Sequence, residues 1–513
     1  MQFPTQQQVI QLLKKNWLFL LYFVLTVSMR FWNFQNSLYF IYDQGRDAVA
    51  MQRIAQGHFV LVGPTTGING LFLGPLWWYI NLPAFLIGGG NPYTIALWDI
   101  AISCLAIPLF WWVSHTLFQK KFFALISAIF LAIIPGSIHA SIFVWNPLLS
   151  VPLMMAALIS FYKSRESRTW LALGFFLIAL TLQSEFAYAI FFLPALFFSI
   201  PWIRQKFDLR DFFVSGLSVG VTLLPQLLFD IRNHFLMTQT VLKSLHDSSN
   251  SVSWTQQFTQ RPHQLLDTGA EILIGRNPQF SWFIPILFLV ILLGFTVIVK
   301  NIRSKNEPYI WKLLALFAFA PYPFFLLWRG NHGYFFWYYI SCHFMFLLPL
   351  FFRGLEEIIR IFSFTKVSKQ AALIFIALCI AVMSLISATH WYSVIFAPIN
   401  NAGTAKMLSA VQTIYDWKNQ DHPSEFTVRT YTANVYTEQY DYLFSWYAKS
   451  HHISPPSTVL SGKEDTWYIV IESRDAAQKF FFDPWYKDAT KNGQRTRQTQ
   501  VGVLTLETWK RIK

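Results

Sequence analysis

Apolar runs of about twenty residues recur along this chain from Trp17 to Trp391. About twenty apolar residues in a helix cross the hydrocarbon core of a bilayer, so each run is long enough to span a membrane. Only 13% of the 513 residues are charged, roughly half the share found in soluble domains. The sequence therefore predicts a polytopic α-helical membrane protein of about eleven spans, at residues 17–35, 93–117, 122–140, 147–162, 169–184, 186–202, 211–230, 281–299, 309–328, 335–352 and 370–392.

The net charge of +14 is distributed as in a membrane protein rather than as in a nucleic-acid binder. Most of the excess lies in short segments between apolar runs, where basic residues mark the cytoplasmic side. We expect no nucleic-acid partner, a cytoplasmic N-terminus and an extracytoplasmic C-terminus in the cell membrane. The basic residues assigned to the inside are Lys14, Lys15, Lys120, Lys121, Lys163, Arg165, Arg168, Arg204, Lys206, Arg210, Lys300, Arg303, Lys305, Arg353, Arg360, Lys366 and Lys369.

The ends of the chain and its cysteines fit the same assignment. The first apolar run ends at Met29-Arg30-Phe31 without a small-residue cleavage signature, which favours a retained anchor over a signal peptide. All three cysteines lie inside apolar runs, so no disulfide framework is implied.

Residues 74–90 are apolar but short, contain Pro83 and close on three glycines. If they formed a further span, every later loop would change sides and its lysines would face outward. The positions of the later basic residues therefore favour an interfacial or re-entrant segment at the outer surface for residues 74–90. The aromatic content of this segment also suits an interface.

Three regions are then expected outside: 35–92, 231–280 and everything after about residue 390. We predict a transmembrane domain over 1–395, with its first outer loop at 36–92, and a small extracytoplasmic α/β domain over 396–513. The second domain is indicated by a polar composition, a helical pattern over 405–418 and two β-rich runs at 466–472 and 501–506.

The first outer loop carries the polar residues most suited to chemistry. Asp43 stands where a helix N-cap belongs, and Gly57 stands where the helix should stop. Asp43, Arg46 and Asp47 then share one helix face. An N-cap aspartate with intrahelical ion pairs would explain these residues without any chemistry. The following turn-rich segments 63–67 and 74–79, which end at Tyr79, would form an aromatic wall for a sugar or lipid site.

This combination resembles the GT-C superfamily of integral-membrane glycosyltransferases. The similarity is greatest to the branch of protein O-mannosyltransferases, lipid A aminoarabinose transferases and RgtA-like bacterial members. In layout it covers about residues 15–350, and its motifs lie at 42–79, 145–147 and 183–185. It implies a GT-C-like fold and transfer of a sugar from a polyprenyl-phosphate donor to an unknown protein, lipid or glycan acceptor.

The resemblance gives roles to three positions. Asp43 would be the general base, because a hydroxyl that attacks an anomeric carbon must lose its proton. Asn146 stands where relatives have an acidic residue, and an amide is a poorer ligand for a hard cation. This difference weakens the case for a bound divalent cation, which stays an open alternative. Asn146-Pro147 also fits a simple helix start. Glu185, in an outer turn, would be a second catalytic residue or a carboxylate merely solvated at the interface.

A lipid-phosphate leaving group needs cationic or donor groups at the outer surface. Arginines expected there suit bidentate phosphate contact, although each would also serve as an interface anchor. No sequence spacing supports a metal site. The candidates, with Arg46 and Arg329 ranked first, are Arg46, Arg232, Arg276, Arg329, His234 and His332.

Other functions remain as alternatives. A transporter or flippase would favour internal repeats and charges near mid-membrane, where Asp99 is the exception to the pattern. A glycan ligase or polymerase shares the polytopic layout and lipid-linked donors. A non-catalytic scaffold is the fourth reading. No nucleotide-binding loop, nucleophile elbow or zinc-protease helix is found.

Overall fold

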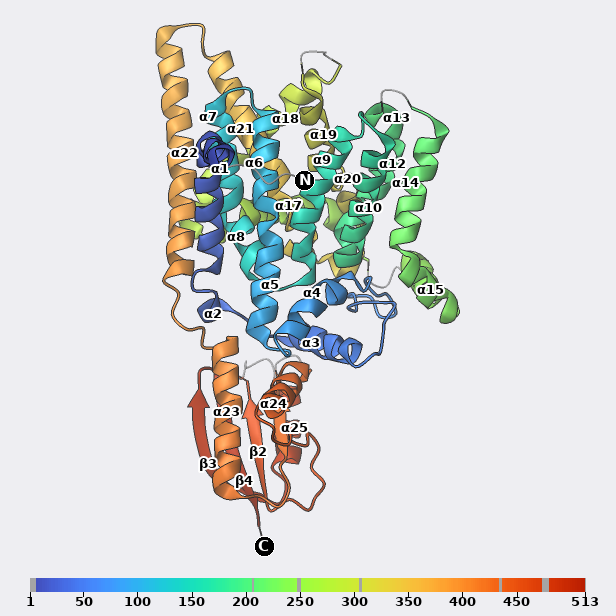
Figure 1. Cartoon of the computed structure of the whole chain (residues 1–513), viewed down its shortest axis with the longest axis vertical. Helices are drawn as coiled ribbons and strands as arrows, with labels where there is room; N and C mark the ends of the chain where they lie inside the picture. The colour runs from blue at the N-terminus through green and yellow to red at the C-terminus, as the bar shows by residue number, and fades with distance from the viewer. Residues whose placement is uncertain are drawn as a thin grey trace.

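The computed structural model describes residues 6–204, 207–246, 251–303, 307–432, 436–472 and 479–512. A long helical body is followed by a small module that contains the sheet (Figure 1). The helices of the body, with the short 3-10 turns η1–η4, are α1 (Gln6–Phe31), α2 (Phe34–Ser37), α3 (Tyr42–Ala55), α4 (Leu76–Ile87), α5 (Pro92–Cys104), α6 (Ala106–Leu117), α7 (Lys121–Ile133), α8 (Pro135–Ile142), η1 (Asn146–Leu149), α9 (Ser150–Lys163), α10 (Arg168–Ser184), α11 (Phe186–Ala189), α12 (Phe192–Phe198), α13 (Ile200–Ile203), α14 (Leu209–Thr222), α15 (Leu224–Arg232), α16 (Leu236–His246), α17 (Trp254–Ile274), η2 (Pro278–Phe283), α18 (Ile284–Lys300), α19 (Tyr309–Phe319), α20 (Tyr322–Leu327), η3 (Asn331–Gly333), η4 (Trp337–Ile340), α21 (Phe344–Ile361) and α22 (Lys366–Ile395).

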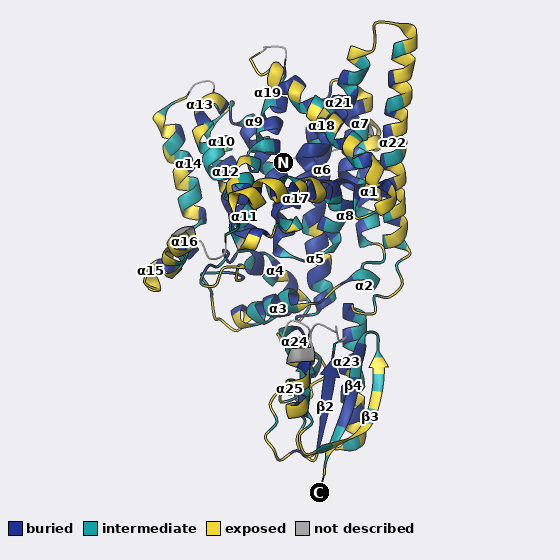
Figure 2. Cartoon of the chain, turned by 180° about the vertical axis from the view of Figure 1, so that it is seen from behind, coloured by how far each residue is buried: buried dark blue, intermediate teal, exposed yellow. Residues whose placement is uncertain are grey.

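Several of these helices are long and apolar enough to cross a membrane. Within the described residues four qualify: Pro92–Leu117, Pro278–Lys300, Tyr309–Leu327 and Lys366–Ile395. Two bent pairs also qualify if each is one span, α7 with α8 at 46° and α14 with α15 at 61°. Exposed side chains run along α22 and α14 on the flanks of the body (Figure 2), where lipid would cover them. The polytopic class is thus supported, while the number of eleven spans stays a prediction.

Helix α1, predicted to contain the first span, is held by a buried arginine. Arg30 is 1% exposed near the end of α1, and its guanidinium donates to neutral oxygens only. Its acceptors are Ser141 Oγ at 2.8 Å, Ser137 Oγ at 3.0 Å and the carbonyls of Thr26 and Ala132 at 2.8 and 2.7 Å. Four such bonds offset the cost of burying the charge and fix α1 against α7 and α8.

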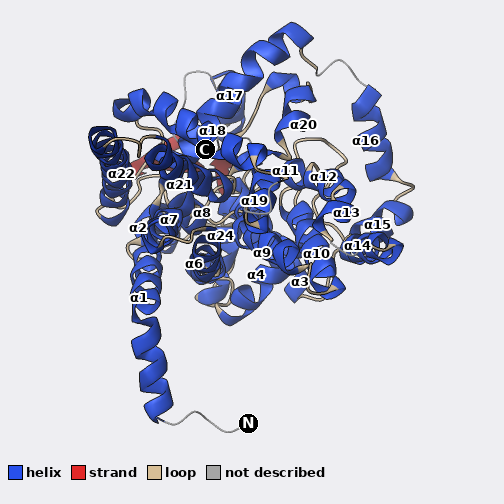
Figure 3. Ribbon diagram, turned by 90° about the horizontal axis from the view of Figure 1, so that it is seen from above, coloured by secondary structure: helices blue, strands red, loops and turns tan. Residues whose placement is uncertain are grey.

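The first outer loop forms a layer between the helical body and the C-terminal module (Figure 1). Helix α4 occupies the segment expected to lie at the interface, and it runs through Pro83 without ending there, contrary to the expected break. The expected loop 231–280 is also largely helical, because it contains α16 and the 21-residue α17. Seen from above, α15, α16 and α17 follow one outer edge of the body, and α1 projects from the opposite side (Figure 3).

The C-terminal module has a four-stranded sheet in the order β1-β2-β4-β3. Strands β1 and β2 are parallel, and the other two pairings are antiparallel. The helical and first β-rich patterns are confirmed by α23 and β2, but the run 501–506 is a hairpin turn at Gly502 rather than one strand. The elements are α23 (Thr404–Asp421), β1 (Val428–Tyr431), α24 (Glu438–Ser450), β2 (Thr466–Ile471), α25 (Lys479–Ala489), β3 (Gly493–Val501) and β4 (Leu504–Arg511).

Helix α24 packs closely on α3. Gly45 on α3 faces the backbone of Gln439, and a Cβ at Gly45 would collide with it. The Tyr442 hydroxyl donates to the carbonyl of Gly90. Tyr436, just before α24, stacks on Tyr42 with ring centroids 4.5 Å apart. The C-terminal module therefore supports the helix that carries Asp43.

Candidate active site

Helix α3 positions the predicted base, although not in the way that its sequence suggests. The helix begins at Tyr42, and the side chain of Gln44 accepts the backbone N–H of Ile41 at 3.0 Å. The expectation that Asp43 is the N-cap is therefore wrong, because Asp43 lies in the first turn. Gly57 follows the helix with a φ of +93°, as a helix-terminating glycine should.

Asp43 is a partly exposed carboxylate held by one ion pair and one indole. Its Oδ1 lies 2.8 Å from Arg46 Nη1, and Trp145 donates a hydrogen bond to it. Burial raises the pKa of Asp43, and the charge of Asp47 adds to the rise, while Arg46 and Trp145 oppose it. A carboxylate whose pKa is raised above its ordinary value, yet which stays 26% exposed, suits general-base catalysis.

Asp47 has a different environment, because it is 4% exposed and fully engaged. The indole N–H groups of Trp77 and Trp78 donate to its two oxygens at 2.7 and 2.8 Å, and Arg46 Nη2 lies 2.9 Å away. These contacts fasten α3 to α4. Tyr79 acts similarly, since its hydroxyl bonds to both the carbonyl and the N–H of Val60 at 3.1 Å. The side chains of Asp47 and Tyr79, which were both predicted to bind substrate, therefore make structural hydrogen bonds within the protein.

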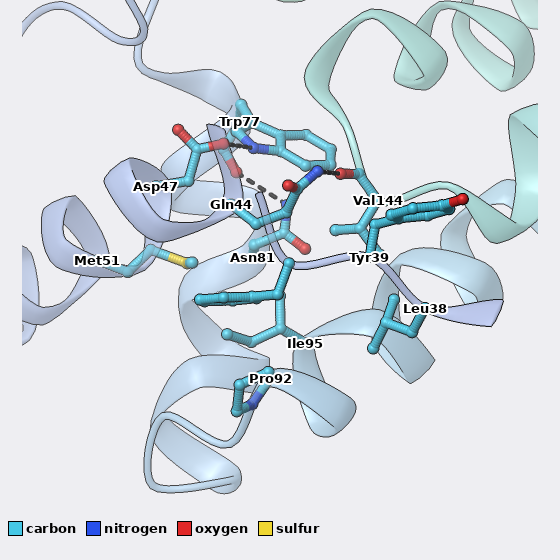
Figure 4. A pocket seen from close by; sticks show the side chains of 11 residues that line it. Leu38, Tyr39, Gln44, Asp47, Met51, Trp77, Asn81, Pro92, Ile95 and Val144 are labelled. Carbon is cyan, nitrogen blue, oxygen red and sulfur yellow. Dashed lines mark hydrogen bonds between the residues drawn. The ribbon is translucent and has the colours of Figure 1, made fainter. Parts of the chain in front are cut away.

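The space behind α3 is too small for a substrate. Gln44, Asp47, Trp77 and Asn81 line a cavity of about 20 Å³ (Figure 4). The Oδ1 of Asn81 has no hydrogen-bond partner among the described residues. A polar void of this volume holds about one water molecule. Asp43 does not line this cavity, so a substrate would have to reach the Asp43 carboxylate from outside it.

Glu185 caps a break between two apolar helices. It follows α10 and its Oε1 accepts the N–H of Ala187 at 3.2 Å, which starts α11. Asn146 fixes the same turn, because its Nδ2 donates to the carbonyl of Ser184 at 2.7 Å. Glu185 is 6% exposed, and burial raises its pKa to about 8. Its carboxyl group is therefore mostly protonated at pH 7 and can donate a hydrogen bond.

Two tyrosines that the sequence reading did not single out connect these carboxyl groups. The Tyr338 hydroxyl lies within electrostatic range of both Asp43 and Glu185, and it is hydrogen-bonded to Tyr339. The ring of Tyr338 also packs edge-on against Trp145 at 4.8 Å. The turn η4 thus brings the first outer loop and the α10–α11 break to one place. Tyr338 and Tyr339 lie in an aromatic-rich run, so the sequence contains no signal that distinguishes them from their neighbours.

A further missed residue is Arg261 on α17. It is 1% exposed, and its guanidinium lies over the rings of Trp328 and Phe335 at 5.8 and 5.0 Å. Tyr339 lies within electrostatic range of both Arg261 and Glu185. Nε and Nη1 of Arg261 have no hydrogen-bond partner among the described residues. Buried donors without a partner are costly and indicate a site for an anion or ordered water.

The other predicted cationic groups make contacts of their own, outside those described for Asp43 and Glu185. Arg232 is exposed at the end of α15, next to His234 with its positive φ. Arg329 stacks over Trp254 at 4.3 Å and donates to the carbonyl of Val252 at 3.2 Å. Arg276 is ion-paired with Glu271 at 2.9 Å. His332 is exposed in η3 with a φ of 49°. Of the arginines first proposed, only Arg46 contacts Asp43.

A resident metal is not suggested by the side chains. Among the described residues, no three His, Cys, Asp or Glu side chains come together in a group that could hold a metal ion. Asn146, at the position where relatives have a carboxylate, uses its amide N–H to hold the backbone. Among the described residues, these side chains therefore form no recognisable cation site.

The fold is similar to those of two solved proteins. No family model and no curated protein matches the chain. Among solved structures, ArnT from Cupriavidus metallidurans matches in its apo state and bound to undecaprenyl phosphate, each with 12% identity and a TM-score of 0.56 over 96% of this chain and 98% of ArnT. The oligosaccharyltransferase AglB from Archaeoglobus fulgidus, in complex with an inhibitory peptide and a dolichol-phosphate, matches with 12% identity and a TM-score of 0.50, over 96% of this chain and 74% of AglB. The likeness to GT-C proteins is thus confirmed for the fold.

Proposed function

We propose that this chain is an integral-membrane glycosyltransferase that moves a sugar from a polyprenyl-phosphate donor to an extracytoplasmic acceptor. The observation that supports this most is that Tyr338 lies within electrostatic range of both Asp43 and Glu185, while the neighbouring Tyr339 lies within electrostatic range of Glu185 and Arg261. The fold shared with ArnT, one structure of which holds undecaprenyl phosphate, supports a lipid-phosphate donor.

In the proposed reaction the acceptor hydroxyl attacks the anomeric carbon of the donor. The new carbon–oxygen bond forms while the bond from that carbon to the phosphate oxygen breaks, and its electron pair leaves with the phosphate. Asp43 takes the acceptor proton. Arg46 holds Asp43 in place, and its charge keeps part of the Asp43 population ionised against the effect of burial.

The leaving phosphate requires positive charge and hydrogen-bond donors. Arg46 is already shared by two carboxylates, Asp43 and Asp47, and so has little capacity left for an anion. Two nitrogen atoms of Arg261, Nε and Nη1, have no hydrogen-bond partner among the described residues and lie in a buried aromatic setting, where a charge-assisted hydrogen bond is strong. We therefore assign the phosphate to Arg261, and the protonated carboxyl of Glu185 donates to the sugar or phosphate without repelling it.

The test is to reconstitute the purified chain in vesicles with radiolabelled polyprenyl-phosphate sugars and a panel of acceptors. The proposal expects label to move to an acceptor and free polyprenyl phosphate to form. A transporter or flippase would instead move intact donor across the bilayer with its glycosidic bond unbroken. A ligase or polymerase would transfer whole lipid-linked glycans rather than single sugars.

A further inference from the structure

A second cavity lies beside Trp337, apart from the small one behind α3. It has a volume of about 200 Å³, is partly open, and is lined by η1, α8, α17, η4 and α22 with mostly apolar surface and a few polar groups. Its lining includes His139, Trp337, Ser341 and His390, with the Glu271–Arg276 ion pair at the end of α17. The volume is below the roughly 300–1,000 Å³ of sites for drug-sized ligands and suits a single small ring with its substituents.

Buried polar atoms inside this cavity have no partner. Ser341 is 3% exposed, and neither its Oγ nor Nε2 of His390 makes a hydrogen bond to any of the described residues. Leaving a buried donor or acceptor unpaired costs about 1–3 kcal/mol, so such groups are normally satisfied by a ligand or ordered water. The cavity is therefore built to hold a polar molecule.

The chemistry of the lining distinguishes between polar ligands. The charges of Glu271 and Arg276 offset each other at 2.9 Å, which leaves no net charge to select an ion. The remaining polar groups are one hydroxyl and two imidazole rings that lie near each other, and all of them both donate and accept hydrogen bonds. Trp337 adds an aromatic wall, with its ring 4.8 Å from that of His139. Uncharged groups that both donate and accept hydrogen bonds, next to an aromatic surface, suit a ring that carries hydroxyl groups.

The cavity adjoins the proposed active site through Trp337. The rings of Trp337 and Trp145 are 5.9 Å apart, and Trp145 donates to Asp43. We propose that this cavity, lined by Ser341, His390, His139 and Trp337, is a second carbohydrate-binding subsite that takes one sugar ring, from either the lipid-linked donor or a glycan acceptor. The proposal deepens the proposed function by placing part of a substrate, but its evidence is the cavity itself.

Binding can be measured without turnover. The full-length protein in nanodiscs is mixed with free hexoses, pentoses and N-acetylhexosamines, and binding is read by saturation-transfer-difference NMR. We expect at least one sugar to bind the wild type, to lose its signal in Ser341→Leu, which fills the cavity, and to bind about two- to tenfold more weakly in Ser341→Ala. The matched control is Ser387→Ala, since Ser387 is also buried with an unpartnered Oγ but does not line the cavity. It should bind as the wild type does.

Competition identifies the source of the ring. A polyprenyl-phosphate sugar that displaces the free sugar assigns the subsite to the donor, whereas displacement only by an acceptor glycan assigns it to the acceptor. The proposal is overturned if no sugar gives a signal that depends on Ser341, since the cavity would then hold water alone. Because no reaction is needed, the subsite can fail while Asp43-dependent transfer is intact, and it can hold even if the chain transfers no sugar.

Discussion

Asp43 and Glu185 are two carboxyl groups whose surroundings give them different proton affinities. Asp43 is partly exposed and paired with Arg46, whereas Glu185 is buried and accepts one backbone N–H. Burial raises the pKa of both, and that of Glu185 reaches about 8. Pairs of this kind let one group act as a base while the other stays protonated.

The first prediction follows from the Glu185 proton. Since the pKa of Glu185 in the folded protein is above its ordinary value of 4.5, folding favours the protonated form, and stability falls as pH rises from about 4.5 through about 8. Glu185→Gln keeps a neutral donor and should remove this decline. Thermal unfolding of both proteins across pH 5–9 measures it. Parallel curves for the two proteins would mean that Glu185 is ionised throughout.

A second prediction at this scale concerns Arg46. Its charge lowers the pKa of Asp43 against the effect of burial. Transfer should decline as pH falls through the raised pKa of Asp43, and Arg46→Gln should move this decline to higher pH. The pH profile of kcat/KM for the two proteins is the measurement. An unchanged pH profile in a folded variant would show that Arg46 does not lower the pKa of the catalytic base.

Arg261 and Arg329 form a matched pair, because each guanidinium lies over a tryptophan ring near the same outer turns. Only Arg261 has unpaired N–H groups next to Tyr339. A charge-assisted contact contributes about 1.5–3 kcal/mol, so Arg261→Ala should raise the donor KM by about ten- to a hundredfold. Arg329→Ala should change it little. Equal effects on the donor KM in both variants would show that Arg261 is not the specific phosphate ligand.

At the scale of elements, the site depends on contacts between segments that are distant in the sequence. Helix α3 is held on one side by α4 through Asp47, and on another by α24 through Gly45. The ion pair of Asp43 and Arg46 sits on this helix, so any displacement of α3 moves the base. Misplacing a reacting group by about 1 Å can cost a hundredfold in rate.

The fourth prediction tests the contact between α3 and α24. In Gly45→Ala the new Cβ meets the Gln439 backbone, and such overpacking costs about 1–3 kcal/mol. We expect a lower unfolding temperature and slower transfer. The control is Gly216→Ala in α14, where a Cβ meets nothing within 4 Å and helix propensity should slightly favour alanine. Similar behaviour of both variants would show that α24 does not hold α3.

Much of the element pattern could be predicted from hydropathy and turn residues. The apolar runs match helices, Gly57 ends α3, and the helical and β patterns after residue 400 predicted α23 and β2. Only part of the site could be predicted from the sequence, because no local pattern shows that Glu185 and Arg261 lie within electrostatic range of Tyr339. Arg261 lies in a polar-looking helix, and Tyr338 and Tyr339 lie among many other aromatic residues. Tertiary contacts alone distinguish them.

At the scale of the whole molecule, the first outer loop and the C-terminal module lie at one end of the helical body (Figure 1). The fifth prediction is that this end faces outward and that the basic loops face the cytoplasm, as the positive-inside rule implies. Cysteines introduced near Lys120 and near Ser457 test it with an impermeant thiol reagent on intact cells. Only the second should react. Labelling near Lys120 would contradict the eleven-span assignment.

The central claim is that Asp43 removes a proton during sugar transfer, and Asp43→Asn tests it most directly. Asparagine keeps the shape of the side chain but removes its basicity and its charge, including the ion pair with Arg46. Loss of a general base should lower kcat for transfer from a polyprenyl-phosphate sugar by about 10²–10⁴-fold, with the unfolding temperature nearly unchanged. If a well-folded Asp43→Asn protein transfers sugar at the wild-type rate, Asp43 is not the base and the proposed mechanism is wrong.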